Sequence, residues 1–107
     1  MLFKSNTVYT LYSNFNAQWW YGVPKSEWED WQNQHLAFLM KESNEVYSVL
    51  LNPNEAVTLL SRCGQDHSKG DKKITIRRPT SGGEIYFVEW NEFPLSSRLC
   101  SLQVPWV

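Results

Sequence analysis

The stretch from Trp19 to Phe38 constrains the fold of this chain most, because it holds four of the six tryptophans and a helix-start signal. Ser26 precedes Glu29 by three residues. This is the spacing of a capping box, in which the hydroxyl and the carboxylate each accept a hydrogen bond from a backbone amide at the start of a helix. The pattern predicts a helix that begins near Ser26 and continues to about Gln34.

The side chains of this segment separate into two helix faces. Trp28, Trp31 and His35 recur at i, i+3 and i+7, which places them on one side of a helix. The opposite side carries polar residues, namely Glu27, Asp30 and Gln34. We therefore expect an amphipathic helix that buries indoles in the core and presents carboxylates to solvent.

The bulk properties of the chain predict one cytoplasmic domain over residues 1–107. A domain of this size buries about two-thirds of its unfolded surface and has no room for a second core. The first residues lack the basic start and continuous apolar run of a signal peptide, and no segment approaches the ~18 apolar residues of a membrane span. The two cysteines, Cys63 and Cys100, form no CxxC pair. We expect reduced thiols in a cytoplasmic protein.

A second helix is expected after Asn52, which can cap a helix that has Pro53 at its first position. Gly64 is placed to end this helix in a left-handed cap. Apolar residues recur at i, i+3, i+4 and i+7 and predict its core face: Ala56, Leu59, Leu60 and Cys63.

Strand patterns lie on both sides of these helices. Residues 35–40 are nearly all apolar and fit either a longer first helix or a buried strand, of which we favour the strand. The expected strands are Thr7–Tyr12, residues 36–42 and 46–51 as a hairpin, Lys73–Arg78 and Glu84–Trp90 as a second hairpin, and an edge strand that includes Leu102, Val104 and Trp106. This order predicts an α+β fold, with a largely antiparallel sheet of about five to six strands and two helices packed on it.

Three aromatic residues in succession, Trp19, Trp20 and Tyr21, precede the first helix. Successive side chains of an extended backbone point to opposite sides, so at least one of these rings faces outward if the segment is extended. The segment is then a candidate contact surface. The alternative is that all three rings lie under a loop.

No residue pattern in the sequence identifies a catalytic or metal site. Cys63, Asp66, His67 and Asp71 lie close in sequence, but no second Cys/His pair completes a tetrahedral zinc site. Neither cysteine stands in a recognisable nucleophile context with a histidine. We expect no enzyme activity, no metal, no cofactor and no small-molecule substrate.

One candidate binding surface is the basic hairpin over residues 72–90. Basic side chains beside aromatic ones can hold a nucleic-acid strand through phosphate contacts and stacking. The residues are Lys69, Lys72, Lys73, Arg77 and Arg78, with Tyr86, Phe87 and Trp90. The alternative is a solvated strand edge protected from aggregation by lysines. The net charge of −1 argues against a dedicated nucleic-acid binder, so an accessory nucleic-acid-binding domain is our second hypothesis.

The other candidate surface is acidic and aromatic. Through the acidic run SEWEDW (26–31) and the WWY cluster (19–21), the chain resembles bacterial toxin-immunity proteins, including those of contact-dependent growth inhibition. The resemblance implies that it binds and inhibits a cognate toxin, often a nuclease. Acids supply fast association and aromatic anchors supply slow dissociation. The expected partner-binding residues are Trp20, Tyr21, Glu27, Glu29, Asp30, Glu42 and Glu45.

Overall fold

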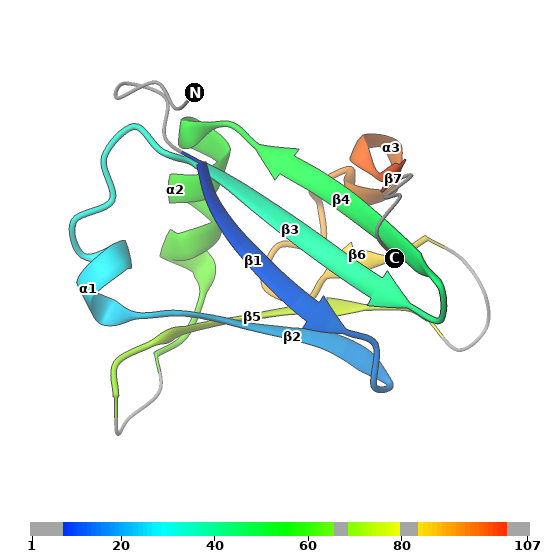
Figure 1. The fold of residues 1–107 in the computed structure, drawn as a ribbon. Helices are drawn as coiled ribbons and strands as arrows, with labels where there is room; N and C mark the ends of the chain where they lie inside the picture. The colour runs from blue at the N-terminus through cyan, green and yellow to red at the C-terminus, as the bar shows by residue number, and fades with distance from the viewer. Residues whose placement is uncertain (1–7, 66–68, 80–83, 103–107) are drawn as a thin grey trace.

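The computed structural model describes residues 8–65, 69–79 and 84–102, which form two sheets and three helices (Figure 1). One sheet has the order β1 (Val8–Asn14), β3 (His35–Glu42), β4 (Glu45–Leu51) and β7 (Cys100–Leu102). The other has the order β2 (Gln18–Val23), β5 (Lys72–Arg77) and β6 (Tyr86–Phe87). The helices are α1 (Lys25–Trp28), α2 (Pro53–Arg62) and α3 (Leu95–Arg98). The α+β class is confirmed.

The prediction of one sheet is wrong, because the strands divide between a four-stranded and a three-stranded sheet. The division occurs between β1 and β2, where Ala17 adopts a left-handed conformation (φ 70°) that is uncommon outside glycine. This turn takes the chain from the first sheet to the second. The chain returns to the first sheet only after α1, so β3 pairs with β1 in parallel, with Val8 opposite His35. All other strand pairs are antiparallel among the described residues.

The predicted first helix is also wrong in length, since α1 has four residues and ends at Trp28. Its N-cap is Pro24, and no side chain caps it, so the capping box expected from Ser26 and Glu29 does not form. The indoles instead make tertiary and local contacts. Trp28 Nε1 donates to the Gly70 carbonyl at 2.8 Å, and Trp31 Nε1 donates to the Gln34 carbonyl at 3.2 Å. The helical spacing of the two indoles therefore reflects core filling at one end of the molecule.

The central hairpin and the second helix are confirmed. β3 and β4 pair antiparallel, with Leu36 opposite Leu51. At the start of α2, Asn52 and Glu55 form a reciprocal capping box, and the helix buries its predicted face. The left-handed cap at Gly64 is not formed, because the chain already leaves the helix at Cys63 in an extended conformation.

The second hairpin is confirmed only in part. β5 is present, but its partner strand is the two-residue β6, which is shorter than the predicted Glu84–Trp90. Beyond β6, the Val88 amide still donates to the Thr75 carbonyl, but the Thr75 amide donates to the Glu89 carboxylate at 2.9 Å. The expected edge strand forms as β7 on β4, and the remainder of that prediction, including Val104 and Trp106, lies outside the described residues.

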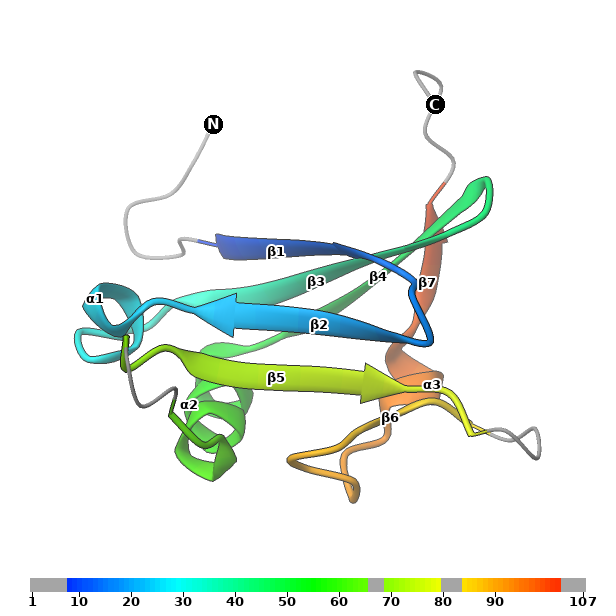
Figure 2. The ribbon, with the colours of Figure 1, turned by 90° about the horizontal axis from the view of Figure 1, so that it is seen from below.

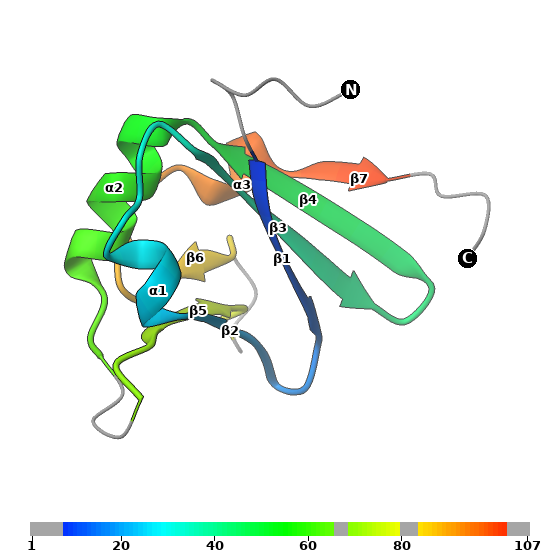
Figure 3. The same ribbon diagram turned by 60° about the vertical axis from the view of Figure 1, so that its left-hand side comes forward.

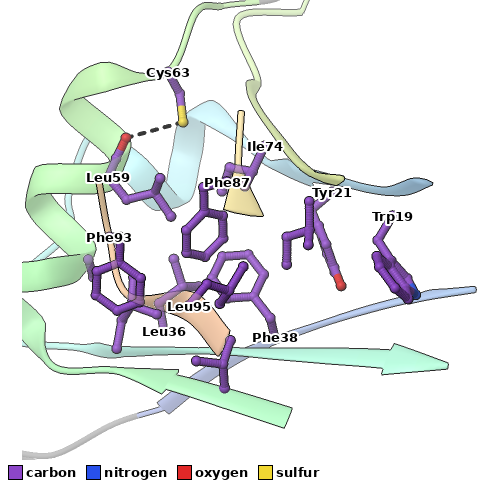
Figure 4. Close-up of a cluster of buried hydrophobic side chains, with 14 of the residues drawn as sticks. Trp19, Tyr21, Leu36, Phe38, Leu59, Cys63, Ile74, Phe87, Phe93 and Leu95 are labelled. Carbon is purple, nitrogen blue, oxygen red and sulfur yellow. Dashed lines mark hydrogen bonds between the residues drawn. The ribbon is translucent and has the colours of Figure 1, made fainter. Parts of the chain in front are cut away.

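The core lies between the two sheets, and α2 covers one end of the space between them (Figure 3). Aromatic rings occupy its centre: the rings of Tyr21 and Phe38 have centroids 4.9 Å apart, and those of Phe38 and Phe87 lie 5.2 Å apart (Figure 4). Leu59 and Cys63 bring α2 against this cluster. The high aromatic content is thus used largely to fill a core that two short sheets enclose.

Candidate interaction surfaces

The acids expected on one surface lie at two ends of the molecule. Glu27, Glu29 and Asp30 belong to α1 and the turn after it, whereas Glu42 and Glu45 face each other where β3 turns into β4. Seven residue steps along β3 separate these ends, or about 23 Å at about 3.3 Å per residue. Figure 2 shows α1 and the β3–β4 turn at opposite ends. A single acidic surface over all five residues is therefore contradicted.

The two expected aromatic anchors face opposite sides of β2. Trp20 is 57% exposed, which confirms that at least one ring of the cluster faces outward, whereas Tyr21 is 6% exposed. The Tyr21 hydroxyl donates to the Leu39 carbonyl at 3.2 Å, and burial raises its pKa well above the usual value. Tyr21 is a core residue and not a surface anchor, in contrast to the expectation.

Trp20 lies on the outer face of the three-stranded sheet, away from the predicted acids. It stands opposite Thr75, whose carbonyl accepts a hydrogen bond from Val88, so Trp20, Thr75 and Val88 form a row across the sheet. Val88 is also exposed. The next row places Arg77 between Gln18 and Tyr86. The surroundings of Trp20 are thus mixed, with Val88, Arg77 and Tyr86 beside the polar Thr75 and Gln18.

The α1 end combines two indoles with a small cavity. Trp28 and Trp31 line a cavity of about 230 Å³ between α1 and α2, together with Val57, Leu60, Ser61 and Lys72. Lys72 is fixed there, because its ammonium lies 4.7 Å from the centre of the Trp28 ring and donates to the Cys63 carbonyl at 3.1 Å. Val57 is 51% exposed on α2. The cavity therefore has two aromatic walls, and Val57 adds an exposed apolar side chain to its lining.

Negative charge gathers around the same end. Glu27 and Glu29 flank Trp28 in the chain, and Glu29 lies 3.7 Å from Lys25 in a surface ion pair whose members are each 55% exposed. Such a pair is weak. Tyr9, whose ring packs edge-on against Trp31, has a raised pKa, first because of burial and then because of the charges of Glu27 and Asp71. Asp71 thus adds to the acidic end.

The sequence did not indicate that Asp71, Tyr9 or Val57 belongs to this end. They come from the loop before β5, from β1 and from α2. The sequence offered one signal, because Val57 is apolar but falls outside the predicted core face of the second helix.

At the opposite end, one of the two expected acids is paired with an arginine. Arg78 lies 2.6 Å from Glu42 and places its guanidinium 5.5 Å from the centre of the Trp19 ring. The Tyr47 hydroxyl donates to the Glu45 carboxylate, and this hydrogen bond raises the Tyr47 pKa. A cavity of about 300 Å³ lies here, lined by Trp19, Met40, Tyr47, Arg78, Glu84, Ile85, Ser96 and Leu99. Of the two charged residues that line it, Arg78 is paired with Glu42.

The thiols occupy different environments. Cys63 is buried and donates to the Leu59 carbonyl at 3.2 Å, and burial raises its pKa to about 12 (Figure 4). Such a thiol is neutral at physiological pH and is a poor nucleophile or metal ligand. Cys100 is free and exposed on β7. Asp66 and His67 lie outside the described residues. Within the described ranges, no cluster of three or more His, Cys, Asp or Glu has a metal-binding arrangement.

Among the helices in the described ranges, none is long and apolar enough to cross a membrane. Comparison with protein-family models, with curated proteins and with solved structures gives no match to this chain.

Proposed function

We propose that this chain is an immunity protein that binds and inhibits a cognate toxin, and that this toxin is a nuclease. The toxin docks on the α1 end. One observation carries the proposal: Trp28 and Trp31 line a cavity against α2 in a region where Glu27, Glu29 and Asp30 gather. The arrangement joins two properties of a tight protein interface, an apolar anchor site and a charged surround.

The charge of the α1 end suits a basic partner. A nuclease must bind phosphates, so the surface around its active site is rich in Lys and Arg. Glu27, Glu29 and Asp30, with Asp71 nearby, present the opposite charge. Complementary charge raises the association rate and disfavours partners of like charge.

The cavity can receive an anchoring side chain of the toxin. At about 230 Å³ it has room for an aliphatic side chain of the toxin between the two indoles and Val57. The walls are fixed before binding, since Trp28 is held by Gly70 and Trp31 packs against Tyr9. A preformed site avoids the cost of ordering side chains on association.

The test measures binding to a purified candidate toxin domain by surface plasmon resonance at several salt concentrations. We expect the double variant Glu27→Lys/Asp30→Lys to slow association and to weaken its dependence on salt. The matched control, Glu45→Lys/Glu84→Lys, changes the net charge equally at the opposite end and should leave the association rate unchanged. Equal rates for wild type and the α1 variant, with tight binding retained, contradict docking at α1.

A second candidate function is nucleic-acid binding on the outer face of the three-stranded sheet. The observation that favours it is the exposure of Trp20 beside Arg77 and Tyr86. Two of the expected cations are already engaged, Lys72 with Trp28 and Arg78 with Glu42. Few phosphates can then be neutralised, so binding should be weak and sensitive to salt. Sub-micromolar oligonucleotide binding near physiological ionic strength, lost in Trp20→Ala and Arg77→Ala, would favour this function over toxin binding.

A further inference from the structure

Trp19 lies at the end of the buried core remote from α2 (Figure 4), and it lines the cavity of about 300 Å³ described above. The lining residues of this cavity come from β2, β3, β4 and α3, and from the segments next to β5, β6 and β7. The volume is at the lower end of the range of about 300–1,000 Å³ for small-molecule sites. The cavity is therefore large enough for one small organic ligand.

The inner wall of the cavity is apolar and held in place. Trp19 and Met40 are each 1% exposed. The Trp19 ring packs against the ring of Phe15, with centroids 4.8 Å apart, and its Nε1 donates to the Lys41 carbonyl at 3.2 Å. A wall that is fixed before binding avoids the cost of ordering side chains on association.

One organic cation already lies in this cavity, because the chain supplies it. The Arg78 guanidinium is 5.5 Å from the centre of the Trp19 ring and 2.6 Å from the Glu42 carboxylate. An aromatic face and a carboxylate are both favourable partners of a guanidinium or ammonium group. The position of Arg78 thus shows which chemical class the walls accept: a cation carried on an apolar stem.

The acids at the mouth of the cavity outnumber this cation. Glu42 and Glu45 face each other on neighbouring strands, and the exposed Glu84 lines the cavity. Arg78 pairs with Glu42, and Glu45 accepts a hydrogen bond from the neutral Tyr47 hydroxyl. The Glu84 carboxylate forms no ion pair or hydrogen bond with the described residues. Three carboxylates therefore stand against one guanidinium.

Two further cations near this end are engaged outside the cavity. The Lys41 ammonium donates to the Ser43 carbonyl at 2.7 Å, and Arg77 Nε donates to the Gln18 side chain at 2.9 Å. Both residues alternate with buried neighbours along their strands, so they lie on the outer faces of the two sheets. The excess of negative charge at the mouth therefore remains for a ligand.

We propose that this cavity binds a small organic cation, an ammonium or guanidinium compound with a short aromatic or aliphatic body. The body lies against Met40, Ile85 and Leu99, and the cationic group pairs with the Glu84 carboxylate at the mouth. The site is at the opposite end of the molecule from α1, so the proposal does not depend on toxin binding (Figure 2).

The test uses three probes of similar shape and different charge, namely phenethylammonium, phenethyl alcohol and phenylacetate. Each is titrated into the full chain and followed by NMR at the Trp19 indole N–H and the Met40 methyl group. Phenethylammonium should bind about fivefold more tightly than the alcohol, the ratio expected for a partly exposed ion pair. Phenylacetate should bind most weakly, because the three carboxylates repel it.

Variants separate the charge of the site from its shape. Glu84→Gln should abolish the preference for phenethylammonium and leave the affinity for the alcohol unchanged. Its matched control is Glu92→Gln, which removes an exposed carboxylate that pairs with Arg62 and should keep the preference. Ser96→Phe places a ring in the cavity and should abolish binding of both probes.

Four results would overturn the proposal. They are binding of none of the probes to wild type, equal affinities for the cation and the alcohol, a preference that survives Glu84→Gln, and shifts confined to Trp28 and Trp31 at the other cavity.

Discussion

Arg98 holds Glu55 with two parallel hydrogen bonds, of 2.8 Å and 2.9 Å, and thereby joins α3 to the start of α2. The same carboxylate completes the α2 capping box by accepting from the Asn52 amide at 3.0 Å. Glu55 is therefore at once a helix cap and half of a bidentate ion pair. The pair is partly shielded, with side chains 35% and 23% exposed.

We expect Glu55→Ala to lower the free energy of unfolding by about 1–3 kcal/mol, since it removes a capping interaction and leaves the Arg98 guanidinium without its partner. Solvent screening of these partly exposed groups keeps the effect below that of a fully buried pair. Urea denaturation measures the loss. Glu92→Ala, which removes the exposed partner of Arg62, is the control and should change stability by less than about 0.5 kcal/mol.

Glu55 should also contribute to acid sensitivity. Its pKa is lowered from the ordinary 4.5, first by the hydrogen bonds from Arg98 and further by the Asn52 amide. A group with a depressed pKa in the folded state stabilises the protein above its unfolded pKa, and this stabilisation is lost as pH falls through the folded pKa. When pH is lowered from neutral to below 4.5, the free energy of unfolding should therefore fall less for Glu55→Gln than for wild type. Urea denaturation at each pH measures this change. If the free energy of unfolding depends on pH equally in the two proteins, other carboxylates control acid unfolding.

Adjacent indoles should differ sharply in their effect on stability. Trp19 is 1% exposed and Trp20 is 57% exposed, although both belong to β2. Trp19→Ala should cost about 3–5 kcal/mol, because it leaves a large cavity between the sheets. Trp20→Ala should cost less than about 1 kcal/mol. Comparable losses measured by urea denaturation would mean that the outer face of the three-stranded sheet is covered in solution.

The success of sequence prediction here depended on whether an element is held by local interactions. α2 was predicted well because Asn52, Pro53 and Glu55 determine its start within the segment itself. The β3–β4 hairpin was predicted well because its two apolar runs flank a short polar turn. In both cases, the decisive contacts are close in sequence.

The predictions failed where distant contacts decide the structure. Trp28 Nε1 donates to the Gly70 carbonyl 42 residues away, and the helical spacing of Trp28 and Trp31 led to the prediction of a helix longer than the four residues of α1. Glu42 lies far from α1 because β3 carries it to the other end of the molecule. The acids Glu27, Glu29 and Asp30 do share one end, since they are neighbours in the chain. That Asp71 and Val57 belong to the same end depends on tertiary packing, because they come from the loop before β5 and from α2.

The two thiols should react at very different rates in the native protein. Cys100 is exposed, whereas Cys63 is buried and its pKa is raised to about 12. Alkylation without denaturant should therefore modify one thiol per chain, and alkylation in denaturant without reductant should modify both. Intact-mass measurement distinguishes these products. No modification under denaturing, non-reducing conditions would reveal a disulfide and would contradict the expectation of a reducing compartment.

The cavity of the proposed toxin site can be tested apart from the acids that surround it. Val57 is half exposed at the rim of the cavity between Trp28 and Trp31 and contributes little to the core. Val57→Asp should leave the fold intact and weaken toxin binding by about 2 kcal/mol or more, mostly through faster dissociation, because a carboxylate at the rim must be desolvated against an apolar anchor. Val88→Asp, at a comparably exposed position on the other sheet face, is the control. If Val88→Asp weakens binding and Val57→Asp does not, the toxin docks beside Trp20, and the acids at α1 only steer its approach.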